Sequence, residues 1–450
     1  MKKLYIRTFG CQMNVYDSSK MKDLMAGQGY EIVDNTDDVD MVIMNTCHIR
    51  EKVKEKIFTE LGKLTKLKAK KIKEGGYMVI AVAGCVAQTE GNEIFKRMPI
   101  VDIVVGPGSY HELPDLVDEA LRKQQFRTRD IKTEFLNDEK FDRLPVADEV
   151  KGVTEFVTIQ EGCNKFCSYC IVPYTRGREY SRKPENIMKE VEALVKNGVK
   201  EVTLLGQNVD NYKGIDEAGN KITLAGLIEK IAKIDEIKRI RYMTSYPSQV
   251  TQDLIDAHKN VEKLMPYIHL PVQSGSDKVL KSMNRKYNVK GYLEVVKKLR
   301  EARPDIAISS DFIVGFAGET EEEFEETMSL VKEVKYAQAF SFMYSPRKGT
   351  KGAEMNNQID ENVKADRLSR LQEVLNTQQL EFNKQYQDKV LPVLVERISK
   401  RNDKALFGKS PCMQSITFGC KKNKLKDFIG KIVNVKITEV SIRGLKGEMI

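Results

Sequence analysis

Apolar and polar positions follow two alternating patterns along the first 125 residues. Three short apolar runs, LYIRTFGC, MVIMNTC and YMVIAVAGC, are each followed by a segment with helical spacing. The second of these segments carries an apolar stripe at three- and four-residue steps, formed by Val53, Ile57, Leu61 and Leu64. Strands that alternate with helices imply a parallel sheet. Residues 1–125 are therefore predicted to form an α/β domain.

The alternation stops in a polar segment, 126–151, which is predicted to be a linker, and returns from residue 152. Six apolar strands follow: FVTIQEG, KEVTLLGQNV, RIRYMTSYP, YIHLPVQSG, IAISSDFIVGF and AQAFSFMYSP. Helical patterns lie between most of them, and one has Pro184 for its first turn and Gly198 for its C-terminal cap. Six strand–helix units are fewer than the eight of a closed barrel. Residues 152–383 are predicted to form a partial (β/α)6 barrel.

The last segment, 384–450, has a different pattern. KVLPVLVERI, SITFGC and GKIVNVKITEV are short strands between polar turns, which indicates a small β-barrel. This segment holds fifteen Lys or Arg against six Asp or Glu, an excess of nine that equals the net charge of +9 of the whole chain. A compact basic module is typical of a polyanion binder. The alternative is a lysine-rich surface that serves solubility.

The composition indicates the cellular compartment of the protein, and the compartment decides how its eight cysteines are interpreted. With 31% charged residues and no run of eighteen apolar residues, no membrane helix is expected. The start, MKKLYIRTFGCQMN, lacks the apolar core of a secretory signal, so a cytoplasmic location is predicted. In a reducing compartment, suggestively spaced cysteines favour metal binding or catalysis over disulfides.

Three cysteines, Cys163, Cys167 and Cys170, form CNKFCSYC after the first strand of the predicted barrel. Active sites of β/α barrels lie at the C-terminal ends of the strands, where this loop is placed. Three thiolates can hold three irons of a 4Fe–4S cluster and leave the fourth open to a substrate such as S-adenosylmethionine. The alternative is structural zinc, which needs four ligands. The nearest histidines, His111 and His258, are not at zinc-motif spacing.

Three further cysteines, Cys11, Cys47 and Cys85, are far apart in sequence, yet each ends an apolar strand. In a parallel sheet these ends lie along one edge, the usual ligand crevice of α/β folds. A second three-cysteine cluster site, again with one open iron, is predicted there. The alternative is three unrelated buried cysteines.

The triplet with an aromatic residue before its last cysteine, Tyr169, resembles the signature of the radical S-adenosylmethionine superfamily. The resemblance implies that Tyr169 lies against the adenine of the cofactor. It also implies cofactor contacts at Gly206 and Gln207 of LLGQN, which lacks the usual acidic residue, and at Gly315 and Glu319 of DFIVGFAGET. The alternative for both glycine motifs is a simple turn at a strand end.

Over nearly its entire length the chain resembles the methylthiotransferase family: a cluster domain, a radical core and a small TRAM barrel. TFGCQMN, NTCHIREKVKEKIFTELGKL, GCVAQTEG, IQEGCNKFCSYCIVPYTRGREYSR and LPVQSGS are most similar to its MiaB-type branch, the tRNA-2-methylthio-N6-dimethylallyladenosine synthases. Ala317 departs from the proline that relatives commonly have in FAGET.

The resemblance implies two 4Fe–4S clusters and two S-adenosylmethionine molecules per turnover. One molecule methylates sulfur at the Cys11, Cys47 and Cys85 cluster. The other, at the Cys163, Cys167 and Cys170 cluster, yields the radical that removes hydrogen from C2 of N6-isopentenyladenosine at position 37 of tRNA. It further implies a tRNA anticodon loop as partner, an electron donor such as flavodoxin or ferredoxin, and a sulfur donor. A monomer is expected.

Several residues outside the cysteine groups are candidates for RNA or cofactor contacts. After the cysteine loop, Arg176, Arg178 and Arg182 are candidates, and the alternative is that they are solvated surface arginines. Tyr174 and Tyr180 are candidates for stacking on RNA bases, but core packing is slightly favoured for both. In the tail, Arg443 and Lys446 are candidate phosphate contacts. Cys412 and Cys420 have no ligand-spaced partners and are predicted to be packing residues.

Other functions compete with this interpretation. Sister enzymes act on threonylcarbamoyladenosine in tRNA or on an aspartate of a ribosomal protein, and the basic tail favours RNA over protein. A rival of another class is a non-catalytic iron–sulfur RNA-binding protein, which would bind tRNA without cleaving S-adenosylmethionine.

Overall fold

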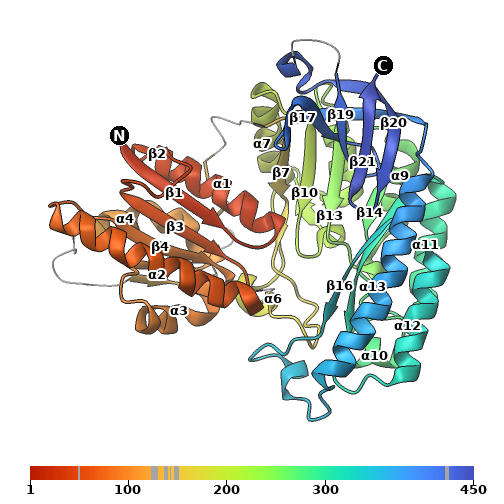
Figure 1. Cartoon of the computed structure of the whole chain (residues 1–450), viewed down its shortest axis with the longest axis horizontal. Helices are drawn as coiled ribbons and strands as arrows, with labels where there is room; N and C mark the ends of the chain where they lie inside the picture. Colours follow the sequence, from red (N-terminus) through yellow and green to blue (C-terminus); the bar gives the residue numbers. More distant parts are fainter. Residues whose placement is uncertain (49–50, 123–129, 136–139, 142, 146–151, 421–424) are drawn as a thin grey trace.

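The N-terminal part of the chain is one parallel sheet. The computed structural model describes residues 1–48, 51–122, 130–135, 140–141, 143–145, 152–420 and 425–450. The strands of this sheet are β1 (Lys2–Thr8), β2 (Tyr30–Ile32), β3 (Met41–Thr46), β4 (Val79–Gly84), β5 (Ile103–Val105) and β6 (Asp130–Lys132). All neighbours are parallel, in the order β2-β1-β3-β4-β5-β6 (Figure 1). The predicted α/β class is confirmed.

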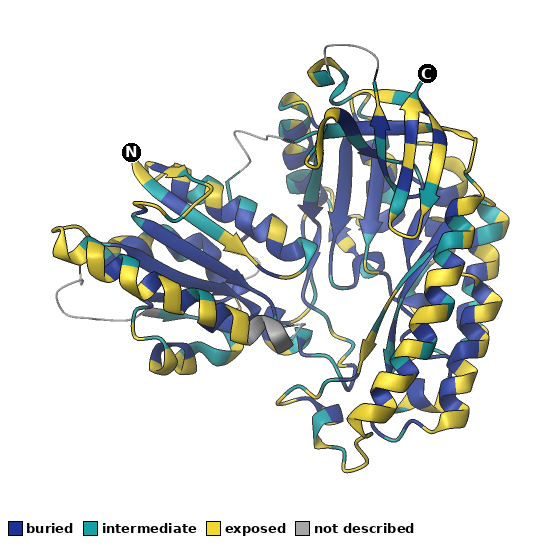
Figure 2. Ribbon diagram, in the orientation of Figure 1, coloured by how far each residue is buried: buried dark blue, intermediate teal, exposed yellow. Residues whose placement is uncertain are grey.

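Helices cover both faces of this sheet because β3 and β4 are almost entirely apolar and buried at every position (Figure 2). The helices are α1 (Gln12–Ala26), α2 (Glu51–Lys73), α3 (Cys85–Arg97), the short η1 (Pro107–Glu112) and α4 (Leu113–Arg122). One core lies under α2 and α3, and the other lies under α1 and α4. Ile57, Leu61 and Leu64 of the predicted stripe are buried in the first core. The side chain of Val53 lies outside the described residues.

The predicted linker, 126–151, is partly structured. Residues 130–132 form β6, the edge strand that pairs with β5. A strand of three residues among polar neighbours is too short to show an alternating pattern. It forms because it pairs with β5, and the sequence of the strand itself does not reveal this pairing. Residues 126–129, 136–139, 142 and 146–151 lie outside the described residues.

The central part is an open, curved row of six parallel strands. They are β7 (Thr154–Thr158), β10 (Glu201–Leu205), β13 (Arg239–Met243), β14 (Tyr267–His269), β15 (Ala307–Val314) and β16 (Gln338–Met343). The sheets β13-β10-β7 and β14-β15-β16 meet at one parallel bridge between Ile240 and Leu264. The predicted partial barrel is confirmed.

Helices cover the outer face of this half-barrel (Figure 1). They are α7 (Pro184–Lys196), α8 (Leu224–Ala232), α9 (Gln252–Asn260), α11 (Val289–Ala302), α12 (Glu321–Val334) and α13 (Glu361–Lys384). The short helix α6 (Val172–Arg176) instead contacts α3 and η1 of the N-terminal part, and α10 (Asp277–Ser282) packs in a separate cluster with Phe316 and Tyr344. Short turns η2 (Val209–Asn211), η3 (Pro247–Gln249) and η4 (Lys351–Glu354) complete this part of the chain. Pro184 occupies the first turn of α7, and Gly198 follows its end at φ +91°, both as predicted. The structure adds two small antiparallel pairings that the apolar pattern did not predict: β8 (Gln160–Glu161) with β9 (Tyr180–Ser181), on either side of the cysteine loop, and the hairpin of β11 (Lys213–Ile215) with β12 (Lys221–Thr223).

The chain ends in a closed five-stranded barrel, as predicted, in the order β17-β18-β19-β21-β20. Its elements are β17 (Val390–Ser399), β18 (Asn402–Lys409), β19 (Ser415–Gly419), η5 (Leu425–Phe428), β20 (Ile432–Ser441) and β21 (Gly444–Met449). Arg239 and Arg241 of β13 hold it in place by donating to backbone carbonyls of the barrel, at 2.7–2.9 Å. Because Arg239 begins β13, the barrel sits at the N-terminal ends of the core strands. In the described part of the chain, every helix is too short or too polar to cross a bilayer.

Candidate functional site

The first cysteine group lies at one edge of the N-terminal sheet. Cys11 caps α1 three residues after β1, Cys47 directly follows β3, and Cys85 opens α3 directly after β4. The register aligns Thr8 with Asn45 and Thr46 with Gly84, so the three strands end side by side. The structure therefore brings these residues to a common edge, as the strand pattern predicted.

Two glycines permit the close approach of the three loops. A Cβ on Gly10, at φ +114°, would stand 2.2 Å from Cys47 Cβ, and one on Gly84, at φ +93°, would stand 2.3 Å from the Thr46 carbonyl oxygen. A side chain at either position would push the loops apart. Asn14 joins the same loops, since its Nδ2 donates to the carbonyls of Phe9 and Thr46 at 3.0 and 2.9 Å.

The second group lies in the loop between β8 and α6, at the C-terminal end of β7. The Cys170 N–H donates to the Cys167 carbonyl at 2.9 Å, which folds the triplet back on itself. Two donors point at its sulfurs: the Val172 N–H lies 3.5 Å from Cys170 Sγ, and Arg285 Nη1 lies 3.5 Å from Cys167 Sγ. Donors of this kind favour thiolate, the form of cysteine that binds metal.

Arg285 is a site residue that the sequence did not reveal. It also donates to the Tyr169 hydroxyl at 3.3 Å and to the Pro271 carbonyl at 2.9 Å, and it packs over the ring of Tyr246. Its partner in the cysteine loop, Cys167, lies 118 residues earlier in the chain, and no motif surrounds Arg285. A lone arginine after a short helix carries no signal that could have found it.

A buried charge network connects the two cysteine groups. Arg176, only 3% exposed, donates to Asp17 and Glu161 at 2.6 Å each and to Asn14 at 3.2 Å. Asn14 Oδ1 in turn accepts the Cys11 thiol at 3.6 Å, and Glu161 lies two residues before Cys163. Lys140 adds a second buried cation, 2.7 Å from Glu161 and 3.7 Å from Asp17. One chain of contacts therefore links the first group to the second.

The thiols of the two groups differ in acidity. The hydrogen bond with Cys47 lowers the pKa of Cys11 to about 6, with Arg176 adding to the effect and burial opposing it. Burial raises the pKa of Cys85, which Arg176 partly offsets. Burial also raises the pKa of Cys163 to about 11 and that of Cys170 to about 12. Buried thiolates require a positive partner, which iron provides.

The donor sets fit iron–sulfur clusters better than a single ion. Among the described residues, no three Cys, His, Asp or Glu side chains converge closely enough to hold one metal ion. A cluster makes no such demand, since each thiolate binds a different iron. Two all-thiol groups of three, each next to an arginine, are therefore suited to clusters that keep one iron free of protein ligands.

The predicted cofactor contacts have structural partners. Gln207 Oε1 accepts the Gly162 N–H at 2.6 Å, so this side chain supports the start of the cysteine loop. Glu319 Oε2 accepts the Gly315 N–H at 2.6 Å and Arg367 at 3.0 Å. Burial raises the pKa of Glu319 to about 7 against both contacts. Gly206 follows β10 directly, beside Gln160.

Two of the arginines after the loop differ from both interpretations of the sequence. Arg176 and Arg182 are neither solvated nor available to RNA, because ion pairs with buried carboxylates hold them in the interior. Arg178 is exposed. The core packing favoured for Tyr174 is wrong, since it is 49% exposed, whereas Tyr180 is half-buried and stacks on Phe141 at 5.9 Å.

In the tail, Cys412 is buried beside Tyr386, and Cys420 packs on the barrel core, so both are packing residues as predicted. Arg443 and Lys446 are exposed, and Lys446 pairs with Glu439 at 2.9 Å.

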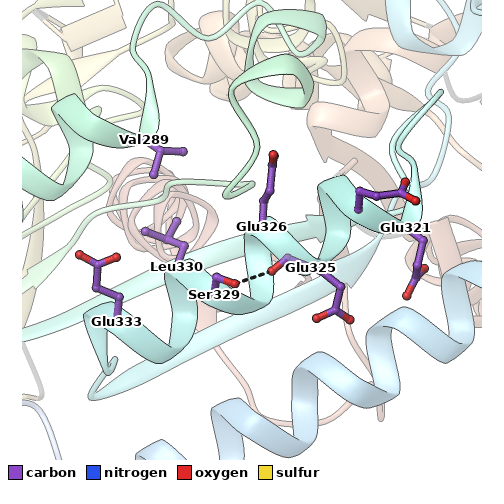
Figure 3. A pocket seen from close by; sticks show the side chains of 8 residues that line it. Val289, Glu321, Glu325, Glu326, Ser329, Leu330 and Glu333 are labelled. Carbon is purple, nitrogen blue, oxygen red and sulfur yellow. Dashed lines mark hydrogen bonds between the residues drawn. The ribbon is translucent and has the colours of Figure 1, made fainter.

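A voluminous hollow lies elsewhere, on the outer surface of α12. It measures about 680 Å³ and is lined chiefly by glutamates, together with Val289 and Leu330 (Figure 3). Arg370 of α13 pairs with Glu321 at 2.6 Å and with Glu325. This hollow contains none of the cysteines and is a charged helix surface.

Fold and site together define the class of protein. An open six-stranded β/α barrel with a three-cysteine loop after its first strand is the architecture of radical S-adenosylmethionine enzymes, and residues 157–331 match the model of the Radical SAM superfamily. Residues 3–106 match Uncharacterized protein family UPF0004, and residues 384–450 match the TRAM domain.

Similar proteins identify the family within this class. The chain is 50% identical over 450 residues to a protein of Rickettsia felis, with all of both chains covered, and 49% identical over 450 residues to one of Rickettsia rickettsii, with the same coverage. Both are named tRNA-2-methylthio-N(6)-dimethylallyladenosine synthase. The chain belongs to the family of these synthases.

Two solved structures share the fold. The radical S-adenosylmethionine methyltransferase TsrM from Kitasatospora setae, with cobalamin and a [4Fe-4S] cluster bound, superimposes with a TM-score of 0.55 at 13% identity, covering 78% of this chain and 77% of that one. The cobalamin-dependent S-adenosylmethionine radical enzyme OxsB gives a TM-score of 0.51 at 12% identity, covering 84% of this chain and 56% of that one.

Proposed function

We propose that this protein adds a methylthio group to C2 of N6-dimethylallyladenosine at position 37 of tRNA, beside the anticodon. Relatives that are half identical over the full length bear the name of that activity. The observation that carries the proposal is the pairing of two cysteine triplets, on two sheets, through the buried Arg176 network. Two incompletely ligated clusters suit two tasks, radical formation and sulfur delivery.

In the core, Cys163, Cys167 and Cys170 would hold a 4Fe–4S cluster, and this cluster would bind S-adenosylmethionine. When bound, these groups supply a 5′-deoxyadenosyl radical, which can remove hydrogen from an aromatic carbon that acid–base chemistry leaves inert. Arg285 and the Val172 N–H stabilise the thiolates, while Arg285 also holds the hydroxyl of Tyr169, the residue that would lie against the adenine of the cofactor. Gly206 and Gln207, at the end of β10, would lie beside the cofactor.

Gly315 and Glu319 follow β15 and would contact the ribose and adenine of the cofactor. Glu319 orders the turn that begins at Gly315, which is at φ +68°. This turn lies at the same C-terminal strand ends as the cysteine loop, where β/α barrels bind their ligands.

At the edge of the N-terminal sheet, Cys11, Cys47 and Cys85 would hold the second 4Fe–4S cluster, which would supply the sulfur of the methylthio group. Two S-adenosylmethionine molecules are used per turnover, one for the methyl group and one for the radical. Arg176 keeps positive charge beside Cys85 and fixes the distance between the two groups, because it binds residues of both domains at once.

The domains are assigned as 1–125 together with the edge strand β6 for the second cluster, the rest of 126–151 as connection, 152–383 for the radical core and 384–450 for RNA binding. The partners are the tRNA anticodon loop, an electron donor such as flavodoxin or ferredoxin, and a sulfur donor. The protein works as a cytoplasmic monomer.

The proposed function is tested by identifying the nucleoside that the protein produces. Reconstituted protein is incubated anaerobically with a reductant, S-adenosylmethionine and tRNA carrying either dimethylallyladenosine or threonylcarbamoyladenosine. Mass spectrometry of the nucleosides should show a methylthio group on the first and none on the second. Reaction of the threonylcarbamoyl tRNA alone would assign the chain to the sister activity. S-adenosylmethionine left intact with both tRNAs would favour a binding protein.

A further inference from the structure

The concave face of the half-barrel is covered unevenly. On β7, β10 and β13 it packs against α1 and Phe141, in a cluster with Met13, Leu205 and Met243. On β16, in contrast, the rings of Phe340 and Phe342 are 43% and 40% exposed. Two large apolar side chains left open on neighbouring positions of one strand face are informative, because exposure of such rings to water is unfavourable.

The register shows that these rings point into the half-barrel. Phe340 pairs with Asp311 and Phe342 pairs with Ile313. The alternate residues of β15, Phe312 and Val314, belong to the core under the outer helices. Residues paired across parallel strands share a face, so Phe340 and Phe342 lie on the inner one. The contact of Phe340 with His269 of β14, at 6.3 Å between ring centroids, agrees with this direction.

Apolar contacts lead from this surface to both cysteine groups. Ile313, the neighbour of Phe342, packs in one cluster with Tyr169 of the CxxxCxxC loop. On the other side, Met243 packs in one cluster with Cys11. The exposed rings therefore lie on the inner face that both groups border.

We propose that Phe340 and Phe342 bind the dimethylallyl group of the tRNA adenosine, an inference that rests on the function proposed above. The branched, apolar dimethylallyl group is what separates this adenosine from an unmodified one. Bases of single-stranded RNA are commonly held on aromatic side chains. A surface that offers two exposed phenyl rings complements such a substituent, whereas the partly exposed Asp311 beside Phe340 presents a negative charge that would repel a phosphate.

The experiment compares two tRNAs on the cluster-loaded, full-length protein. Binding of the same anticodon stem-loop, with dimethylallyladenosine or with unmodified adenosine, is measured by fluorescence anisotropy. Wild type should prefer the modified RNA by roughly tenfold to a hundredfold, the range expected for burial of a small apolar group. Phe340→Ala/Phe342→Ala should reduce this preference to about unity without changing the affinity for unmodified RNA.

Controls separate recognition from folding. Met343→Ala changes a similarly exposed residue on the opposite face of β16, and it should leave the preference intact. Should the double variant fail to fold, Phe342→Ala alone carries the same comparison, with a partial loss expected. A full preference in a folded phenylalanine variant overturns the assignment, and so does a wild type without any preference.

Failure of the proposed function is recognised separately. If wild-type protein methylthiolates dimethylallyl tRNA while the phenylalanine variants keep their preference, only the binding assignment is wrong. If wild-type protein leaves this tRNA unmodified, the proposed function itself fails.

Discussion

Replacing Arg176 with Met should destabilise the protein far more than replacement of an exposed arginine. Arg176 and Lys140 neutralise Asp17 and Glu161, and all four side chains are at most 3% exposed. Without Arg176, two buried carboxylates share one cation. Breaking a buried ion pair from one side costs about 3–5 kcal/mol, because the remaining charge stays desolvated. That is a large part of the roughly 5–15 kcal/mol by which a typical protein is stable.

The measurement is urea unfolding under anaerobic conditions, followed by circular dichroism. Arg370→Met is the matched control: Arg370 pairs with Glu321, Glu325 and Asp366, but its side chain is 38% exposed. Exposed pairs of this kind contribute at most about 1 kcal/mol. Adding Asp17→Asn to Arg176→Met removes the excess negative charge and should recover part of the stability. An Arg176→Met protein within about 1 kcal/mol of wild type would refute the idea that this network holds the two domains together.

Four other outcomes are expected. Anaerobically reconstituted protein should contain about eight irons, and about four with both cysteine groups intact would contradict two clusters. Cys163→Ala should abolish 5′-deoxyadenosine formation with tRNA binding near normal, and continued formation would remove this residue from the radical step. Lys404→Gln/Lys436→Gln, on the exposed barrel surface, should make the slope of log binding constant against log salt shallower by about one for each phosphate that a lysine no longer neutralises, and an unchanged slope would place the RNA elsewhere. Burial opposes ionisation of Glu190, yet Lys20 and Arg182 lower its pKa to about 2. Its contribution to stability should therefore be complete above about pH 4.5 and disappear as the pH falls toward about 2, a decline that Glu190→Gln should lack in urea titrations.

The cysteine groups could be predicted from the sequence because the relevant information is local. An apolar run that ends in cysteine predicts a strand end, and parallel pairing then aligns such ends at one edge. The residues that connect the groups could not be predicted in the same way. Arg176 lies 159 residues from Asp17, and nothing near either residue indicates its partner. Contacts at that separation are set by how two domains meet.

The alternation of polar and apolar residues along a strand also gives a wrong prediction of exposure where another domain buries the polar face. In RIRYM the arginines alternate with apolar residues, a pattern typical of a strand with one solvated face. Arg239 and Arg241 are nevertheless 1% exposed, because the terminal barrel covers them and supplies carbonyl partners. The residues that cover these arginines lie between 153 and 170 positions further along the chain, so no local pattern could predict them.

The position of the terminal barrel on the core defines a distance between the barrel and the cysteine loop. Those two arginines fix the barrel where the core strands begin, whereas CNKFCSYC follows the end of β7. A five-residue strand spans roughly 17 Å. If the barrel binds the tRNA backbone as proposed, the RNA must span at least this distance to reach the loop, and the distance of a nucleotide from the bound backbone would then contribute to its selection.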